Sequence, residues 1–299
     1  ASSPAAADWY GIVKSGYDRI SLRYCRGEYY KRFIDYHQYY GGVNGPDYNW
    51  ATVDSSRIEH CLIRHGTEAA ISGYDSYYGF HYVKDNTFHD TPLIKGQSFS
   101  NYEIVIQNNT ATDVFSYGFY NSDILVYSHG HSSWLGDTLY ARIENNTIEF
   151  DPDRQAKEGI YVRQTGQNSG NPNYVRHVTI SNNTIDMSSA PNGEGIQYSN
   201  GYETNNQVLD ILNNNISNVH EYAIRIDQGL KGRIRNNTIV NTNLQYSGYS
   251  SSDYNGAIQV EYSSQEIVGN SISGAMTNGM MLYNVDDRVD SNTVINCAG

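Results

Sequence analysis

Ile234-Arg235-Asn236-Asn237-Thr238-Ile239 is the stretch that decides the fold, because close copies of it recur along the chain. Three close copies begin at Ile143, Ile180 and Ile211. Looser copies retain the spacing of the motif, or at least the apolar residues at its two ends. They lie at residues 58–63, 83–88, 106–111, 267–272 and 289–294. A short motif that returns throughout a chain is the signature of a repeat architecture.

The spacing of the copies favours a stacked coil over separate hairpins. With the second Asn or its equivalent as a marker, the successive gaps are 25, 23, 37, 37, 31, 23, 33 and 22 residues. A minimum gap near 22 residues, with several longer gaps, is typical of coils in which some loops carry insertions. Hairpins would need Asn-Gly or Asp-Gly turns at the break, and the copies have none there.

A second motif follows most copies and predicts a strand. Its side chains alternate with period two, as those of a half-buried strand do. The five examples lie at residues 159–163, 195–198, 223–227, 257–261 and 279–283, and they read GIYVR, GIQY, AIRID, AIQVE and GMMLY.

The Asn-Asn-Thr-Ile corner and the Gly-Ile-x-Val strand together resemble the repeat of the right-handed parallel β-helix family. Its members include pectate-lyase-like polysaccharide lyases, mannuronan epimerases and periplasmic accessory proteins. The resemblance, over about residues 57–298, implies an all-β, single-domain, right-handed parallel β-helix. About nine to eleven rungs, stacked at about 4.8 Å, would make a rod roughly 45 to 50 Å long. Because lyases, epimerases and inert surface proteins share such coils, the resemblance implies no single function.

The second Asn of each copy is expected to point into the coil. There its amide can pair with the backbone of the turn and with the Asn one rung away, so that each buried amide has partners. The predicted ladder consists of Asn109, Asn146, Asn183, Asn214, Asn237, Asn270 and Asn292. The glycosylation pattern N-x-Ser/Thr, at Asn108, Asn145, Asn182, Asn215 and Asn236, is interpreted as a by-product of the repeat.

The beginning of the chain obeys the repeat poorly. Residues 1–55 form a Tyr-rich segment that we interpret either as degenerate opening rungs or as an assembly segment, and residues 56–299 form the predicted β-helix. The chain has 28 Tyr against 7 Phe. Exposed Tyr suits a protein interface, where a rigid ring adds contact area, and it equally suits stacking on sugars.

Charge and hydropathy restrict the partners and the location. The formal net charge is 20 − 32 = −12, and an acidic surface is a poor partner for nucleic acid. No apolar run approaches the length of a membrane span. The chain starts at Ala1 with a run of small residues, which is typical of a secreted protein whose signal peptide has been removed and equally of a chain that has been trimmed. We therefore expect an extracellular or cell-surface location.

The last copy of the motif is followed by five residues, so the last predicted rung lacks a polar capping repeat. Either a natural cap has been cut away, or another subunit supplies the cap by pairing with the open strand edges. Three Cys cannot all pair within one chain, and Cys25 and Cys297 lie near opposite ends of the predicted rod. We therefore predict that Cys25 and Cys297 form a disulfide between copies of the protein. Cys61 is predicted to be a small buried side chain.

Stacking the second motif in register predicts two outward columns. The first holds Tyr161, Gln197, Arg225, Gln259 and Met281, and the second holds Arg163, Ser199, Asp227, Glu261 and Tyr283. For an enzyme, the candidate catalytic residues are Arg163, Arg225, Asp227, Glu261 and Tyr161. A β-elimination needs a cation beside the uronate and a base for the proton. The same residues also fit a solvated face with cross-rung ion pairs, which is the interpretation that we favour.

Two weaker signals are interpreted as ordinary surface chemistry. Phe150-Asp151-Pro152-Asp153 resembles the Asp-Pro-His motif of mannuronan epimerases, but Asp153 stands where the His would take part in proton transfer. Asp-Pro is also common in turns. His129 and His131 lack a third metal ligand with suitable spacing. No cofactor motif is found, so we expect no metal and no other cofactor.

Two functions from different classes remain. The favoured one is an extracellular structural protein that self-associates end to end through its strand edges into a filament, sheath or surface layer, with copies of itself as partner. The alternative is a polysaccharide lyase or an enzyme similar to C5-epimerases, with an acidic polysaccharide as substrate. The sequence supports catalysis less strongly than assembly, because no catalytic motif is complete.

Overall fold

A computed structural model describes residues 11–14, 19–37, 54–76, 79–98, 102–115, 122–130, 138–153, 158–166, 175–187, 193–200, 207–227, 231–242 and 256–298. Within these ranges every regular element is a β-strand. None of the described residues belongs to a helix that is long and apolar enough to cross a lipid bilayer.

The strands form three faces, and each turn of the chain contributes one strand to each face. Face 1 contains β1 (Ile12–Lys14), β4 (Arg32–His37), β7 (Ala69–Ser76), β10 (Ile94–Ser98), β13 (Ser122–Gly130), β16 (Glu158–Gly166), β19 (Glu194–Asn200), β22 (Ile224–Asp227), the first part of β25 (Gly256–Val268) and β27 (Asn278–Val285). Face 2 contains β2 (Arg19–Arg23), β5 (Asp54–Glu59), β8 (Gly79–Lys84), β11 (Tyr102–Gln107), β14 (Thr138–Glu144), β17 (Val175–Ser181), β20 (Gln207–Leu212), β23 (Lys231–Arg235), the second part of β25 and β28 (Val289–Asp290). Face 3 contains β3 (Arg26–Glu28), β6 (Leu62–Arg64), β9 (Thr87–His89), β12 (Thr110–Val114), β15 (Thr147–Phe150), β18 (Thr184–Asp186), β21 (Asn215–Val219), β24 (Thr238–Thr242), β26 (Ser271–Ala275) and β29 (Thr293–Ile295).

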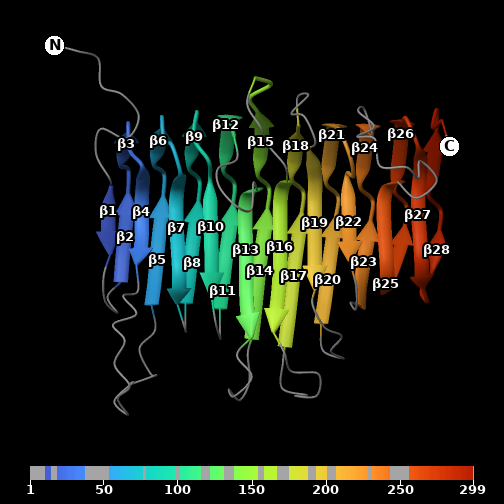
Figure 1. Ribbon diagram of the computed structural model, residues 1–299, viewed down its shortest axis with the longest axis horizontal. Helices are drawn as coiled ribbons and strands as arrows, with labels where there is room; N and C mark the ends of the chain where they lie inside the picture. Colours follow the sequence, from blue (N-terminus) through green and yellow to red (C-terminus); the bar gives the residue numbers. More distant parts are fainter. Residues whose placement is uncertain are drawn as a thin grey trace.

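Every described strand pairs in parallel with its counterpart one turn away, so the turns stack along a single axis (Figure 1). Face 3 has ten strands, and the described chain therefore makes ten rungs. β25 runs from face 1 into face 2, which joins these two faces into one 19-stranded sheet. The predicted all-β parallel β-helix is confirmed, while its hand stays a prediction.

The first rung lies in the Tyr-rich part of the chain. β1, β2 and β3 form this rung, and β4 begins the second. Residues 1–10 and 38–53 lie outside the described residues. The described strands of this segment are thus rungs of the same coil.

Single residues in the left-handed conformation turn the chain between face 2 and face 3. In five rungs this residue is the first Asn of the motif or its equivalent, namely Asn108, Asn145, Asn182, Asn213 and Asn236, with φ between 55° and 56°. Asn tolerates this conformation because its short polar side chain can bond locally. Four of these exposed residues carry the glycosylation pattern, so the pattern arises at the corner and outside the core.

The second Asn of each copy points into the coil and joins a continuous ladder. In each step the side-chain nitrogen of one Asn donates to the side-chain oxygen of the next and to a backbone carbonyl in the preceding rung. The ladder runs through Asn86, Asn109, Asn146, Asn183, Asn214, Asn237, Asn270 and Asn292. The predicted ladder is confirmed, and Asn86 extends it by one rung.

The apolar ends of the motif fill the core beside the ladder. Ile143, Ile180, Ile211 and Ile234 pair in register along face 2, and all four are fully buried. Burial of such a side chain contributes about 1.5–3 kcal/mol. The same residue types recur because each rung meets the same neighbours above and below.

Candidate functional sites

Face 1 carries both predicted columns in register, but the expected solvent exposure is wrong for Tyr161, Gln197 and Gln259, which are buried. The first runs through Tyr161, Gln197, Arg225, Gln259 and Met281. The second runs through Arg163, Ser199, Asp227, Glu261 and Tyr283. All five candidate catalytic residues therefore share one face of the coil. Arg163 and Arg225 stand two rungs apart, or about 10 Å.

Arg225 is the centre of the polar contacts on this face. Its Nε donates to Asp227 Oδ1 at 3.0 Å, and its Nη1 lies 3.6 Å from Glu194 Oε1. The guanidinium also lies over the Tyr222 ring, 5.1 Å from the ring centroid. Burial alone would lower the pKa of Arg225, but the Asp227 and Glu194 carboxylates outweigh burial and raise the pKa. Two carboxylates already neutralise this cation, so it is poorly placed to neutralise the uronate of a substrate.

Tyr161 is a poor general base in this environment. Burial raises the pKa of its phenol above the ordinary value of 10.0, although the hydrogen bond with Ser199 acts in the opposite direction. A phenol with a raised pKa stays protonated near neutral pH. Tyr161 can therefore donate a hydrogen bond, but it lacks the charge that would abstract a proton.

The two acidic residues of the second column are each held by a side chain of their own strand. Arg225 binds Asp227, and Gln259 Nε2 donates to Glu261 Oε1 at 2.6 Å. Such pairs fit a structural role on the surface of a sheet. The candidate residues thus lie on one face, but their contacts do not form a nucleophile and base pair.

Three residues near this cluster were not among the sequence-based candidates. Glu194 and Tyr222 contact Arg225, and the buried Glu158 pairs in register with Glu194. The sequence does indicate that Glu158 and Glu194 occupy equivalent positions, because Glu-Gly-Ile occurs at residues 158–160 and again at 194–196.

The described part of the Asp-Pro motif has no catalytic arrangement, and the His motif lies largely outside the described side chains. Asp153 N donates to Asp151 Oδ1 at 2.9 Å, and both Pro152 and Asp153 are exposed, so this stretch is a turn. His129 lies near the end of β13, and His131 falls outside the described residues. Among the residues that the structure describes, no group of His, Cys, Asp or Glu is arranged to hold a metal ion.

The last rung exposes apolar side chains whose counterparts one rung inward are buried. Val289 pairs with Ile267, yet Val289 is 44% exposed and Ile267 is 0% exposed. Val294 pairs with Ile272, and here the values are 40% and 0%. Leu282 of β27, in the same rung, is half-buried. We call Leu282, Val289 and Val294 the C-terminal end face.

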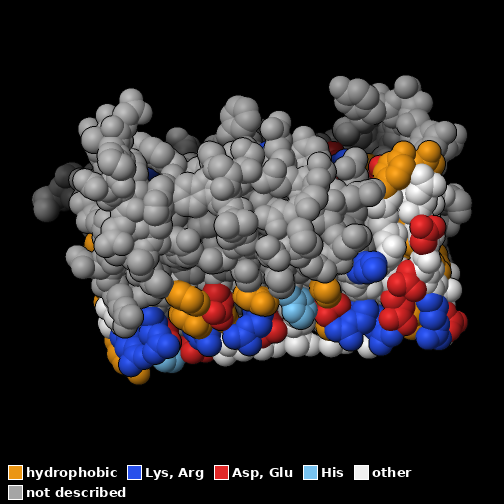
Figure 2. Space-filling model, turned by 90° about the horizontal axis from the view of Figure 1, so that it is seen from below, with side chains coloured by type: hydrophobic (Ala, Val, Ile, Leu, Met, Phe, Trp, Pro, Cys, Tyr) orange, Lys and Arg blue, Asp and Glu red, His pale blue; other side chains and the backbone are white. Residues whose placement is uncertain are grey.

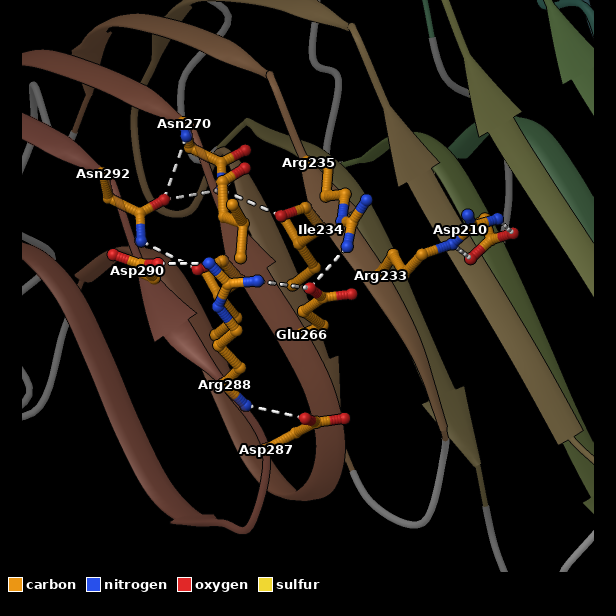
Figure 3. Close-up of polar contacts among 12 residues, drawn as sticks. Asp210, Arg233, Ile234, Arg235, Glu266, Asn270, Asp287, Arg288, Asp290 and Asn292 are labelled. Atoms are coloured by element: carbon orange, nitrogen blue, oxygen red, sulfur yellow. Dashed lines mark hydrogen bonds and ion pairs between the residues drawn. The ribbon is translucent and has the colours of Figure 1, made fainter.

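Ion pairs on face 2 hold this last rung against the rungs before it (Figure 3). The Arg288 guanidinium pairs with Asp290 in its own rung and with Glu266 one rung inward. Glu266 also pairs with Arg235, one rung further in. Asn292 adds a hydrogen bond from its Nδ2 to Ile267 O at 2.8 Å. These contacts connect the rung of the C-terminal end face to the two rungs before it.

The described residues of face 2 have mixed charge. Figure 2 shows Lys and Arg next to Asp and Glu, with hydrophobic side chains between them, along the band where described residues reach the surface. On face 2, Arg57 lies 3.5 Å from Glu59, and Arg233 donates to Asp210 at 2.9 Å. Within the described residues of this face, the mixture of charges offers no continuous basic path for an anionic polymer.

The three cysteines are free thiols at the two ends of the stack. Cys25 and Cys61 occupy the ladder position in the first two rungs, where later rungs have Asn. Cys61 is buried, as predicted, while Cys25 is half-buried. Cys297 follows β29 in the last rung and is also half-buried.

The chain matches no protein-family model, and no curated protein or solved structure is significantly similar to it. The ten stacked rungs of the described residues and the Asn ladder define it as a parallel β-helix protein. Because many functions share this fold, the function has to be argued from the faces and ends of this particular coil.

Proposed function

We propose that this protein is an extracellular structural protein whose copies associate end to end through their terminal rungs. The observation that supports this most strongly is the C-terminal end face, where Val289 and Val294 are exposed and the side chains one rung inward are fully buried. Removing apolar surface from water contributes about 25 cal/mol per Å². A second copy stacked on this rung would bury these side chains as interior rungs already do.

The direction of the Asn ladder also favours the stacking of a second copy on this end, because each ladder Asn up to Asn270 donates to the residue of the following rung. Asn270 donates both its backbone N and its Nδ2 to Asn292 Oδ1, at 2.9 Å each. Within the described residues no further rung offers Asn292 the corresponding acceptor. The open edges of β27, β28 and β29 likewise favour pairing with strands of another copy.

The first rung is the natural partner of the last, because β1, β2 and β3 cover the same three faces as β27, β28 and β29. A junction that continues the coil in register would place Cys25 against Asn292 and Tyr30 against Cys297. A contact between unlike ends does not close on itself, so it grows a filament.

This junction changes the expectation for a Cys25–Cys297 disulfide. Cys25 follows the first left-handed corner of its rung, at Tyr24, whereas Cys297 follows the second corner of its rung, at Asn296. The five residues that separate the two positions within a rung span about 16 Å of extended chain. Disulfide-linked Cα atoms lie within about 7 Å of one another. The predicted bond therefore requires a junction that is shifted out of register, and association itself does not need it.

Lys substitutions at the end face test the proposal. Val289→Lys and Val294→Lys each bring a charge into the junction, whereas Val208→Lys brings the same charge to an exposed Val on the side of the coil. Light scattering and negative-stain microscopy should show filaments for the wild type and for Val208→Lys. The two end-face variants should associate at least about tenfold more weakly, because the new charge would be desolvated without a partner.

Two outcomes would contradict the proposal. One is a wild type that stays monomeric at high concentration, with and without reductant. The other is an equal loss of association in Val208→Lys, which would show that net charge and not the end face controls it. Cys297→Ser should still form filaments, because the in-register junction contains no disulfide at this residue.

A polysaccharide-active enzyme is the second candidate, and it rests on the placement of Tyr161, Arg225 and Asp227 on one face. We rank it second because Arg225 is neutralised by Asp227 and Glu194. A panel of polyuronates, assayed for unsaturated product and for inversion at C5, tests it. Product formation that is lost in Arg163→Ala and Arg225→Ala would favour the enzyme. Folded wild type without product on the whole panel would leave it unsupported.

A further inference from the structure

The Asn ladder stops at Asn86, and the two rungs before it carry cysteines in its place. Cys61 N donates to Asn86 Oδ1 at 2.9 Å, just as Asn86 N donates to Asn109 Oδ1 at 3.0 Å. Leu62 N then donates to Cys25 O at 2.9 Å, which repeats the bond between Thr87 N and Cys61 O in the next rung. Cys25 and Cys61 are therefore stacked neighbours in adjacent rungs.

This stacking places the two thiols within reach of one another. The flanking residues Arg26 and Leu62 pair directly, so Cys25 and Cys61 face each other across neighbouring parallel strands. Such strands lie about 4.8 Å apart, and disulfide-linked Cα atoms lie about 4.4 to 6.8 Å apart. Each sulfur also faces the carbonyl oxygen two residues before it, Cys25 Sγ at 3.4 Å from Arg23 O and Cys61 Sγ at 3.3 Å from Glu59 O. The two side chains thus share one orientation.

We propose that Cys25 and Cys61 form an intramolecular disulfide that ties the first rung of the coil to the second. The bond would join residues 36 positions apart in the sequence (61 − 25 = 36). It would also resolve the odd number of cysteines, because Cys297 alone would stay unpaired. Both thiols belong to one chain, so this inference does not depend on end-to-end association.

The oxidant can be a small-molecule disulfide such as oxidised glutathione. The half-buried Cys25 is the more accessible thiol, so its thiolate attacks the glutathione disulfide and releases one reduced glutathione. The Cys61 thiolate then attacks the Cys25 sulfur of the mixed disulfide and releases the second. Two protein thiols are oxidised, one glutathione disulfide is reduced to two thiols, and the protons of the protein thiols pass to the released glutathione thiolates.

Tryptic digestion separates the three cysteines, which makes the bond directly observable. Cys25 falls in the peptide of residues 24–26, Cys61 in residues 58–64 and Cys297 in residues 289–299. After equilibration with oxidised glutathione, a non-reduced digest should contain peptides 24–26 and 58–64 joined by a disulfide. Denatured protein should then show one free thiol per chain, assigned to Cys297 by alkylation.

Variants separate this bond from other pairings. Cys297→Ser should keep the linked peptide and lose the remaining free thiol, while Cys61→Ser should lose the linked peptide. Reductant should lower the unfolding temperature of the wild type and of Cys297→Ser by roughly 5 °C, and it should leave Cys61→Ser unchanged. Three free thiols in the equilibrated wild type would overturn the inference. A link between peptides 24–26 and 289–299 would overturn it as well, in favour of an intermolecular bond. The digest uses the wild type, so it holds even if a variant fails to fold.

Discussion

Asn183 joins three rungs through one side chain. Its Nδ2 donates to Ile143 O in the rung before and to Asn214 Oδ1 in the rung after. Its Oδ1 accepts from both the backbone N and the Nδ2 of Asn146. Each ladder Asn therefore satisfies its neighbours as well as itself, which a buried amide requires in an otherwise apolar core.

Replacement of Asn183 by Leu is predicted to cost about 1–3 kcal/mol of unfolding free energy. The reason is that two donors of Asn146 and the carbonyl of Ile143 would lose their partners without gaining water. The exposed Thr184 next to it provides the control, since Thr184→Ala removes a side chain of face 3 and no ladder contact. Chemical denaturation of both variants measures the difference. Equal stability of the two would show that the ladder contributes little net free energy.

One copy of the motif cannot be recognised from the sequence, and single residues explain why. Residues 22–27 are a copy, but Tyr24 takes the left-handed corner and Cys25 takes the ladder position. Gly27 takes the apolar end, and Phe33 from the next rung fills the space, since a Cβ on Gly27 would lie 2.4 Å from the Phe33 ring. The fold could be predicted where one residue type recurs at each place. It could not be predicted where a neighbour in space supplies the missing side chain.

At the scale of the strand, register explains how much of face 1 could be predicted. Parallel strands pair residue by residue, so aligning the second motif gives both outward columns at once. The contact between Glu194 and Arg225 could not be found in this way, because Glu194 is the first residue of β19. The alternation of side chains along a strand does not fix whether the first residue of that strand points into the core or outward. The favoured interpretation as ion pairs fits the contact between Arg225 and Asp227, whereas the second carboxylate, that of Glu194, was missed for this reason.

Two ion pairs at the beginnings of β4 and β7 make this part of the coil sensitive to acid. Glu68 lies 2.7 Å from Arg32 Nε and 2.9 Å from Lys31 Nζ. Burial alone would raise the pKa of Glu68, but the hydrogen bonds from Lys31 and Arg32 outweigh burial and hold the pKa below its ordinary value of 4.5. The stability from this contact is therefore complete above that ordinary value, and it is lost as the pH falls through the lowered pKa.

Glu68→Gln should thus destabilise the protein at neutral pH, and the difference from the wild type should shrink as the pH falls from about 7 to about 3. Glu149→Gln is the control, because Glu149 is exposed on β15 and forms no ion pair within the described residues. Its difference from the wild type should not depend on pH in this way. Denaturation at each pH measures both, and hydrogen exchange at residues 31–34 and 68–72 locates the effect. A constant difference for Glu68→Gln would refute the prediction.

At the scale of the whole molecule, each described rung pairs only with the rungs beside it, so the first and the last described rungs each have one described neighbour. The Arg288 pairs with Glu266 and Asp290 compensate for this at the C-terminal end. At the other end we infer that the Cys25–Cys61 bond has the same effect. Both terminal rungs would then be rigid before two copies meet, which lowers the entropy that association costs.

The effect of salt on association should show whether apolar contacts or ion pairs hold two copies together. The formal net charge of −12 makes two copies repel one another, whereas Leu282, Val289 and Val294 of the end face are uncharged. The Debye length falls from about 30 Å at 0.01 M salt to about 8 Å at 0.15 M, so the repulsion between neighbouring copies is screened while apolar burial is not. We therefore predict longer filaments at the higher salt concentration, measured by light scattering at fixed protein concentration. Val294→Lys should gain much less from salt, because its unpaired charge within the contact loses hydration at any ionic strength. Shorter wild-type filaments at the higher salt concentration would instead mean that ion pairs hold the copies together, and the end face would then not be the principal contact.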